Sequence, residues 1–187
     1  MAELKNLIGD IRKRALIQGQ EFTLASGKKS SVYVDCKQVT LWSPSLNRIS
    51  KLFFDKLAEK DCLPKIAAGV SVGGDPLVAG FILECQRRGI EMEGMLIRKE
   101  AKDHGRSAGR RWEGRQPDSG AEIWLLEDVI STGKSSLSAA EYLKEEGFKL
   151  SGIIAIVDRE MGGVESLAKG LGIPVLTLMG LSQITDA

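Results

Sequence analysis

The chain has few residues of the types that metal centres and disulfide frameworks require. Its three cysteines, Cys36, Cys62 and Cys85, are widely spaced and form no CxxC pair. This argues against a zinc site or a disulfide framework and favours a reducing compartment. His104 is the only histidine in 187 residues, and a lone histidine is a poor candidate for a metal site.

Long apolar runs, low-complexity tracts and an excess of charge of either sign are also lacking. No run approaches membrane-spanning length and the first residues contain no signal-peptide core, so we expect a cytoplasmic protein with no membrane partner. A net charge of +1 gives no support for binding nucleic acid. The apolar share of 43% and the charged share of 27% are ordinary for a globular protein. The length suits a single domain, residues 1–187, with a sizeable core.

Helical and strand-like patterns alternate along most of the chain. The apolar spacing predicts a first helix over residues 4–16, a hairpin or small hood over residues 21–41, and a helix capped by Ser43 and begun by Pro44. Further strands are predicted at 66–70, 93–98, 123–128, 153–158 and 175–178, with helices at 75–88, 136–146 and 164–169. This order predicts an α/β fold with a doubly wound, mainly parallel sheet flanked by helices. Ligands are then expected at the carboxyl ends of the strands.

The segment from Trp124 to Ser135 carries the strongest chemical signal. An apolar run ends in the adjacent carboxylates Glu127 and Asp128, and a short loop of small hydroxylated residues and glycine leads into a helix. The carboxylates can face a sugar's hydroxyls or a metal, while the N–H groups of the loop and of the helix N-terminus can hold a phosphate. One short segment can therefore bind both ends of a ribose 5-phosphate.

Two other interpretations of this segment stay open. Gly133, Lys134 and Ser135 also fit the end of a Walker A loop, but the first glycine of that motif would fall at Asp128, where a carboxylate would face the phosphates. The segment could also be an ordinary strand-to-helix turn capped by serine or threonine. Two adjacent acids at the end of an apolar strand favour the phosphate-and-ribose interpretation over both.

Residues 99–120 depart from the regular alternation. They show no apolar periodicity, and the stretch from Arg98 to Arg115 holds seven basic residues against three acids. A solvated surface loop is the ordinary explanation of such a stretch. Because it leaves the same edge of the sheet as the phosphate segment, we expect instead a mobile cationic lid that neutralises a leaving diphosphate and excludes water. His104 within it could donate to that diphosphate or move a proton near neutral pH.

The phosphate segment resembles the phosphoribosyl diphosphate (PRPP) motif of the type I phosphoribosyltransferases. Three further runs extend the resemblance over nearly the whole chain to the orotate phosphoribosyltransferases: residues 22–30 (FTLASGKKS), 98–105 (RKEAKDHG) and 158–160 (DRE). The second run is far more specific than the PRPP motif and selects orotate as the base. The resemblance implies the type I phosphoribosyltransferase fold, with a small N-terminal hood over residues 1–42 and a long flexible catalytic loop over residues 99–120.

The activity implied by the resemblance is transfer of ribose 5-phosphate from PRPP to orotate, giving orotidine 5′-monophosphate and diphosphate in de novo pyrimidine biosynthesis. Mg²⁺ is the implied cofactor. It is expected to arrive on the oxygens of PRPP and not in a metal site of the protein, because magnesium keeps waters and substrate phosphates as ligands. A homodimer is also implied, in which the loop of one chain closes over the site of the other.

The resemblance also assigns the binding of PRPP residue by residue. Glu127 and Asp128 would bind the ribose hydroxyls, and together with Lys102 and His104 of the loop they are the expected catalytic residues. The expected PRPP-binding set is Arg98, Lys99, Lys102, His104, Glu127, Asp128, Val129, Ile130, Ser131, Thr132, Gly133, Lys134 and Ser135.

Three residues would contact orotate in the same comparison: Ser131, Arg159 and Tyr33. Arginine suits the task because its planar fork can pair with a carboxylate through two hydrogen bonds. Two positions depart from the family pattern, since Ala25 and Gly73 stand where many members have a lysine. A glycine-rich turn can still offer backbone N–H groups to the diphosphate.

Two other classes of protein stay open. A purine phosphoribosyltransferase would share the fold but would lack the RKEAKDHG run and the arginine after Asp158. A PRPP-sensing, nucleic-acid-binding regulator would need a basic surface separate from the lid, which the net charge of +1 does not support. We therefore expect orotate and PRPP as partners and no nucleic acid.

Overall fold

A six-stranded sheet forms the centre of the computed structural model, which describes residues 2–23, 29–98, 110–118 and 120–186. The strand order is β5-β4-β3-β6-β7-β8, and all pairs are parallel except β4 with β5. The strands are β3 (Ile66–Val70), β4 (Glu93–Ile97), β5 (Trp112–Glu113), β6 (Glu122–Ile130), β7 (Lys149–Asp158) and β8 (Val175–Gly180).

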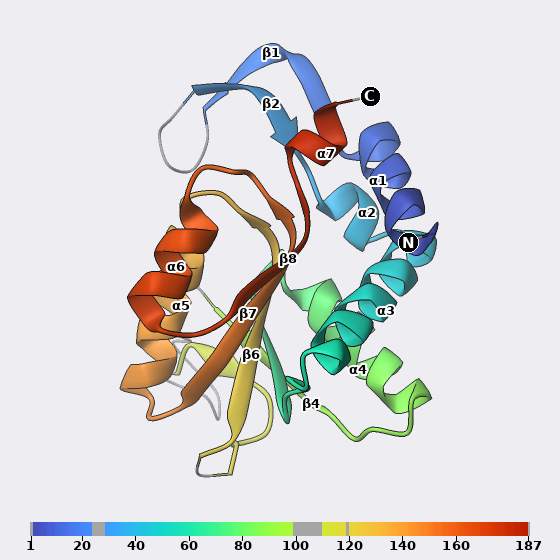
Figure 1. Cartoon of the computed structure of the whole chain (residues 1–187). Coiled ribbons are helices and arrows are strands. Elements are labelled where there is room, and N and C mark those ends of the chain that lie inside the picture. The colour runs from blue at the N-terminus through green and yellow to red at the C-terminus, as the bar shows by residue number, and fades with distance from the viewer. Residues whose placement is uncertain (1, 24–28, 99–109, 119, 187) are drawn as a thin grey trace.

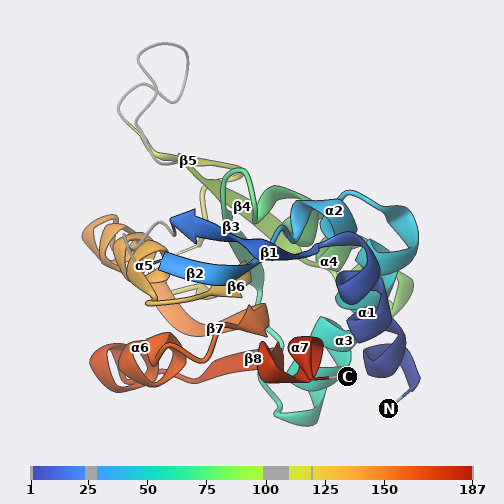
Figure 2. The same cartoon turned by 90° about the horizontal axis from the view of Figure 1, so that it is seen from above.

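A separate antiparallel hairpin, called the hood hairpin below, lies above the carboxyl ends of these strands (Figure 1). It consists of β1 (Leu16–Thr23) and β2 (Lys29–Val34). Seen from above, it extends across the end of the sheet at which α/β folds bind their ligands (Figure 2).

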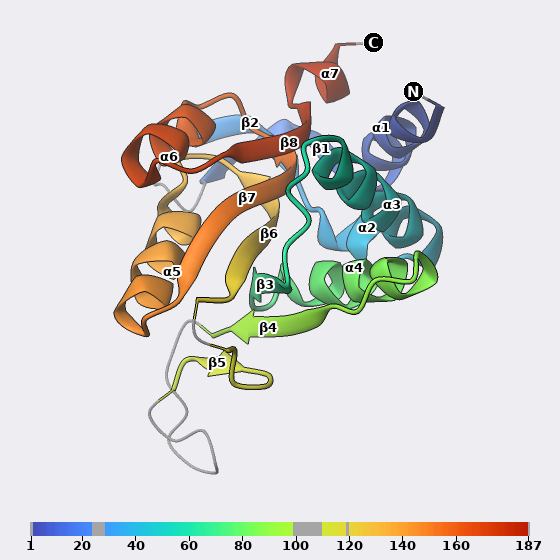
Figure 3. The ribbon, with the colours of Figure 1, turned by 60° about the horizontal axis from the view of Figure 1, so that its bottom comes forward.

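Helices cover both faces of the sheet (Figures 1 and 3). On one face lie α1 (Ala2–Arg14), α3 (Ser43–Glu59) and α4 (Asp75–Arg87), and on the other α5 (Lys134–Glu145) and α6 (Gly163–Leu171). The short helices α2 (Lys37–Thr40) and α7 (Ser182–Thr185) flank the hood hairpin. Among the described residues, no helix is long and apolar enough to cross a membrane.

Strand β7 shows why an uninterrupted apolar run becomes a central strand. Ile154 and Ile156 belong to the core beneath α1, α3 and α4, whereas Ile153 and Ala155 belong to the core beneath α5 and α6. Alternate side chains of a strand point to opposite faces. A parallel strand covered on both faces must therefore be apolar at every position.

The predicted α/β class and parallel sheet are confirmed, and most predicted elements lie within a few residues of the observed ones. Strand β3 matches its predicted bounds, and the glycines expected to end α4 and α5, Gly89 and Gly147, have positive φ values of 76° and 79°. Ser43 was wrong as an N-cap: Trp42 precedes the helix in extended conformation, and Ser43 is the first helical residue.

The segment predicted to lack regular structure, residues 99–120, contains a short strand. Trp112 and Glu113 pair with Ile97 and Leu96 as β5, and the Trp112 side chain is almost fully buried. Two residues give no periodicity that could be read from the sequence. They are held at the edge of the sheet by burial of the Trp112 ring, which packs on Phe148, and by the hydrogen bond from Trp112 Nε1 to Glu146.

Candidate active site

The two adjacent acids in the last part of strand β6, which continues to Ile130, point toward different neighbours. Ser136 Oγ on α5 donates a hydrogen bond of 2.8 Å to Glu127 Oε1, and the Glu127 residue is only 6% exposed. The Asp128 side chain points toward the loop of residues 71–74, where a Cβ added to Gly73 would lie 2.9 Å from Asp128 Oδ2. Alternation along the strand explains the divergence. Of the two carboxylates, only Asp128 is partly open to solvent.

Burial is the main cause of the raised pKa values of Glu127 and Asp128. It raises the pKa of Glu127 to about 7, with a further rise from the charge of Asp128 and a partial offset from the Ser136 hydrogen bond. Burial also raises the pKa of Asp128, which the N–H of Val129 and the charge of Lys37 partly lower again. At neutral pH the site therefore holds one carboxylate that is close to its titration midpoint, as is common at functional sites.

The substitution Glu127→Gln should raise the stability of the ligand-free protein, measured against the unaltered protein at the same pH, more at pH 8 than at pH 5. Because the folded pKa of about 7 exceeds the ordinary value of 4.5, the folded state binds more protons between these values. Stability conferred by the wild-type residue therefore falls as pH rises through this window. Glutamine keeps the shape and the acceptor for Ser136 but does not ionise.

The difference in unfolding free energy between the variant and the unaltered protein should rise by about 2 to 3 kcal/mol from pH 5 to pH 8. Urea denaturation at the two pH values measures it. Glu145→Gln, at an exposed position near the end of α5, is the matched control and should change by less than about 0.5 kcal/mol. An equal difference between Glu127→Gln and the unaltered protein at both pH values would contradict the prediction.

The loop between β6 and α5 presents backbone to the end of the sheet. Gly133 precedes α5, which begins at Lys134, and the side chains of Lys134 and Ser135 are exposed. The start of α6 holds the loop from behind, since a Cβ added to Gly163 would lie 2.3 Å from Ser131 O. The first N–H groups of a helix have no partner within the helix and favour an anion. Binding of a phosphate at residues 131–135 stays a prediction.

Arg159 follows β7 and is buried beneath the hood hairpin. Its Nη2 donates hydrogen bonds to Ser30 Oγ at 3.0 Å and to Val32 O at 2.7 Å. The residue is 7% exposed, and its buried Nε has no hydrogen-bond partner in the described part of the chain. Burial lowers the pKa of this arginine, while Tyr33 nearby acts in the opposite direction. A buried cation with an unmatched donor is costly unless an anionic ligand completes it.

Comparison with known proteins agrees with this arrangement, although no protein-family model matches the chain. The chain is 35% identical to the orotate phosphoribosyltransferase of Thermosynechococcus vestitus over 98% of its length and 94% of that protein. Identity to the enzyme of the same name from Rhodopirellula baltica is 36%, over 94% of the chain and 91% of that protein. The crystal structure of Mycobacterium tuberculosis H37Rv orotate phosphoribosyltransferase in complex with Fe(III) dicitrate matches with a TM-score of 0.81 at 26% identity, covering 98% and 99% of the two chains.

The chain belongs to the orotate phosphoribosyltransferase family. The resemblance noted in the sequence is thereby confirmed, as is the type I phosphoribosyltransferase fold.

Of the residues expected to contact orotate in this family, the structure brings Tyr33 and Arg159 together. The Tyr33 ring stacks on Phe22 of the neighbouring hood strand, with centroids 5.3 Å apart. Ser131 lies in the phosphate loop, where its Oγ is 3.1 Å from the sulfur of Met161. Since Met161 follows Arg159 by two residues, all three expected contacts border one region between the hood hairpin and the ends of β6 and β7.

The structure adds a cation that the sequence analysis did not single out. Lys37 Nζ pairs with Asp35 Oδ1 at 2.6 Å, and its charge lowers the pKa of Asp128. Lys37 also follows Cys36, whose Sγ lies 4.0 Å from Asp128 O. In the sequence, Lys37 could have been noticed only because it lies four residues after Tyr33, an expected orotate contact. Lys37 thus supplies positive charge near Asp128.

The expected lid is anchored at its base to the sheet and to α5. The Arg98 N–H donates to Arg111 O at 2.6 Å, and the Arg98 side chain pairs with Glu113 at 3.4 Å. The Arg111 N–H donates in turn to the Tyr142 hydroxyl at 2.8 Å. Arg98 directly follows β4, and its role in the lid stays a prediction. The family's remaining lid residues, Lys99, Lys102 and His104, lie outside the described residues, as does Ala25.

Metal binding was expected to depend on the substrate. In the described part of the chain, no group of three or more histidine, cysteine, aspartate or glutamate side chains could hold a metal ion. Asp128 offers one partly open carboxylate at the end of β6. Such a donor suits Mg²⁺ that brings its own water and phosphate ligands.

Proposed function

We propose that this chain transfers ribose 5-phosphate from PRPP to orotate, giving orotidine 5′-monophosphate and diphosphate in pyrimidine biosynthesis. The observation that supports it most directly is Arg159, a buried guanidinium whose Nε has no partner among the described residues. Orotate differs from uracil by one carboxylate, the group that an arginine fork binds best. Family membership supports the same reaction.

Within this proposal, residues at the end of β6 bind PRPP, and Arg159 after β7 binds orotate. The backbone of residues 131–135 binds the 5-phosphate, and Asp128 accepts hydrogen bonds from the ribose hydroxyls. Arg159 and Tyr33 hold orotate so that its ring nitrogen faces the anomeric carbon. Positioning the two reactants in this way supplies much of the rate enhancement. The negative charge of Asp128 stabilises the cation-like ribose of the transition state.

The departing diphosphate requires positive charge, which we assign to Arg98, Lys99, Lys102 and His104. Mg²⁺ carried by PRPP would neutralise part of the same charge, and Asp128 would be the protein carboxylate to hold it. We further propose a homodimer in which Lys102 and His104 act on the neighbouring chain's site. A cytoplasmic location stays a prediction.

The test is release of diphosphate from PRPP with each of four bases: orotate, uracil, adenine and guanine. Orotate should react in the presence of Mg²⁺. Uracil, which lacks the carboxylate, should have a kcat/KM at least about a hundredfold lower because Arg159 is left unpaired. Purine turnover comparable to that of orotate, or inertness toward orotate with Mg²⁺ present, would overturn the proposal.

A further inference from the structure

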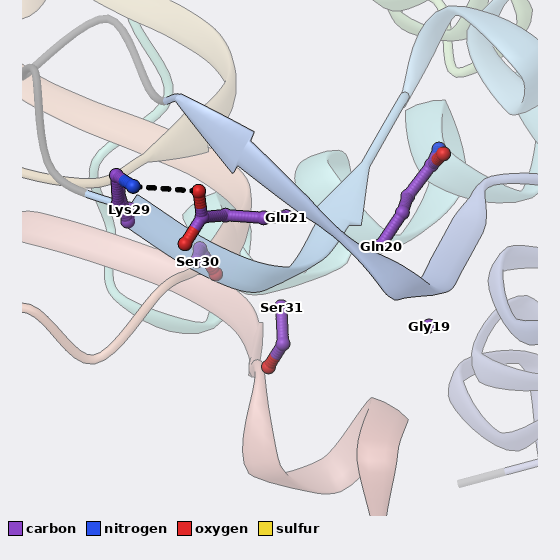
Figure 4. Close-up of a pocket in the computed structure, with 6 residues that line it drawn as sticks. All are labelled: Gly19, Gln20, Glu21, Lys29, Ser30 and Ser31. Carbon is purple, nitrogen blue, oxygen red and sulfur yellow. Dashed lines mark ion pairs between the residues drawn. The ribbon is translucent and has the colours of Figure 1, made fainter.

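The hood hairpin is irregular on one strand only. Gln18 pairs with Val32 and Phe22 pairs with Ser30, so three residues of β1 oppose the single residue Ser31 of β2. The bulge borders an open cavity of about 420 Å³, and Glu21 and Lys29 form an ion pair of 2.7 Å beside it (Figure 4). Because the extra residues belong to β1, β2 keeps its alternation. Arg159 meets β2 at the side chain of Ser30 and at the backbone carbonyl of Val32.

The Ser30 hydroxyl has no spare hydrogen-bonding capacity. Its Oγ donates to Val32 O at 2.8 Å and accepts from the Val32 N–H at 3.2 Å and from Arg159 Nη2 at 3.0 Å. A serine hydroxyl has one donor and two acceptor sites, and all three are used here. Val32 O in turn accepts from both Ser30 and Arg159. The three groups form a closed network that fixes the position of Nη2.

This network also selects the side of the guanidinium that is offered to a ligand. Both hydrogens of Nη2 are directed to β2, at Ser30 Oγ and Val32 O. The donors left for a carboxylate are then the hydrogens of Nη1 and the unmatched Nε–H. Rotation of the guanidinium would change which donors face a ligand, so the contacts with β2 fix the donors that a carboxylate meets.

The backbone of Arg159 is held independently of the hood hairpin, by β6 and by contacts that reach α7. Its N–H donates to Ile130 O at 2.8 Å, and the next residue, Glu160, donates its own N–H to Asp158 Oδ1 and accepts from Ser182 at the start of α7. Contacts with β6 and α7 thus position the backbone of Arg159, whereas the hood hairpin positions its guanidinium group.

We propose that Ser30 is a positioning residue that aims Arg159 at the carboxylate of the base, so that the hood hairpin helps to determine selectivity for orotate. The inference rests on the proposed function, because it assumes that Arg159 binds that carboxylate. Ser30 itself touches no reacting atom. Its effect on catalysis passes through the guanidinium.

Three variants test the role of the hydroxyl. Ser30→Ala removes the acceptor for Nη2, Ser30→Thr retains a hydroxyl at the same Cβ, and Ser31→Ala removes the neighbouring exposed hydroxyl, which points to the other face of β2. We expect Ser30→Ala to raise the KM for orotate by roughly ten- to a hundredfold, the effect of losing one hydrogen bond to a charged group. The KM for PRPP should stay within about twofold, because the phosphate and ribose contacts come from β6 and α5. Ser31→Ala should match the unaltered chain, and Ser30→Thr should restore most of the loss.

The outcomes separate positioning from simple loss of structure. A damaged hood hairpin would raise both KM values together and lower the melting temperature, and this result would overturn the inference. An unchanged KM for orotate in Ser30→Ala, beside an active unaltered chain, would also overturn it while leaving the proposed function intact. If the unaltered chain does not use orotate at all, the proposed function fails and the inference fails with it.

Discussion

Replacing Glu127 by glutamine and Asp128 by asparagine together is expected to lower kcat by roughly two to three orders of magnitude. Both substitutions keep the size of the side chain and remove negative charge next to the expected ribose site. The lost interaction strengthens as the ribose gains positive charge, so it affects kcat more than substrate binding. The fold should persist, because both substitutions keep the size of the side chain and glutamine can still accept the hydrogen bond from Ser136.

The structure further predicts that the two single variants differ. Asp128 is partly open and faces the loop at Gly73, whereas Glu127 is 6% exposed and bonded to Ser136. Asp128→Asn alone should therefore account for most of the loss in kcat, and Glu127→Gln for a smaller share. Steady-state kinetics with saturating PRPP and orotate measure kcat, and circular dichroism checks that each variant is folded. Glu145→Gln serves as the exposed control. A double variant with near wild-type kcat would show that the carboxylates are structural.

Mixing two nearly inactive variants is expected to restore activity if the lid works on the neighbouring chain. Lys102→Ala removes a cation from the proposed lid, and Asp128→Asn removes a carboxylate from the other part of the site. In a mixed dimer, the site with intact Asp128 receives an intact Lys102 from its partner. Random mixing should therefore restore about one quarter of wild-type activity, because about half of the dimers are mixed and each has one complete site.

The control for this experiment shows that mixed dimers have formed. Chains carrying different affinity tags are mixed after reversible dissociation, and pull-down through one tag shows whether the other chain is present. Lys102→Ala alone should lower kcat far more than it weakens orotate binding, because the diphosphate charge develops mainly in the transition state. Verified mixed dimers without recovered activity would show that the lid acts on its own chain.

The elements that the sequence predicted well are those with strong local signals. The apolar strands β3 and β7 are covered on both faces, and Gly89 and Gly147 end helices at positive φ values that other residues rarely adopt. The phosphate loop could also be predicted, because the end of β6, the glycine and the start of α5 are contiguous in sequence. The irregular hood and the strand β5 were less predictable, since a bulge and a two-residue strand have no periodicity.

The sequence by itself determined the family, and it predicted the parallel α/β sheet and the strand-loop-helix segment at residues 124–135, because the patterns behind them are local in the chain. Only the tertiary structure decided how Arg159 is aimed, since Ser30 lies 129 positions away in the chain. It also decided that Glu127 titrates near pH 7, that Asp128 alone of the pair is partly open, and that Lys37 lies near it. Burial and the electrostatic field depend on every element packed around a group, so a residue's type and position in the sequence leave them undetermined.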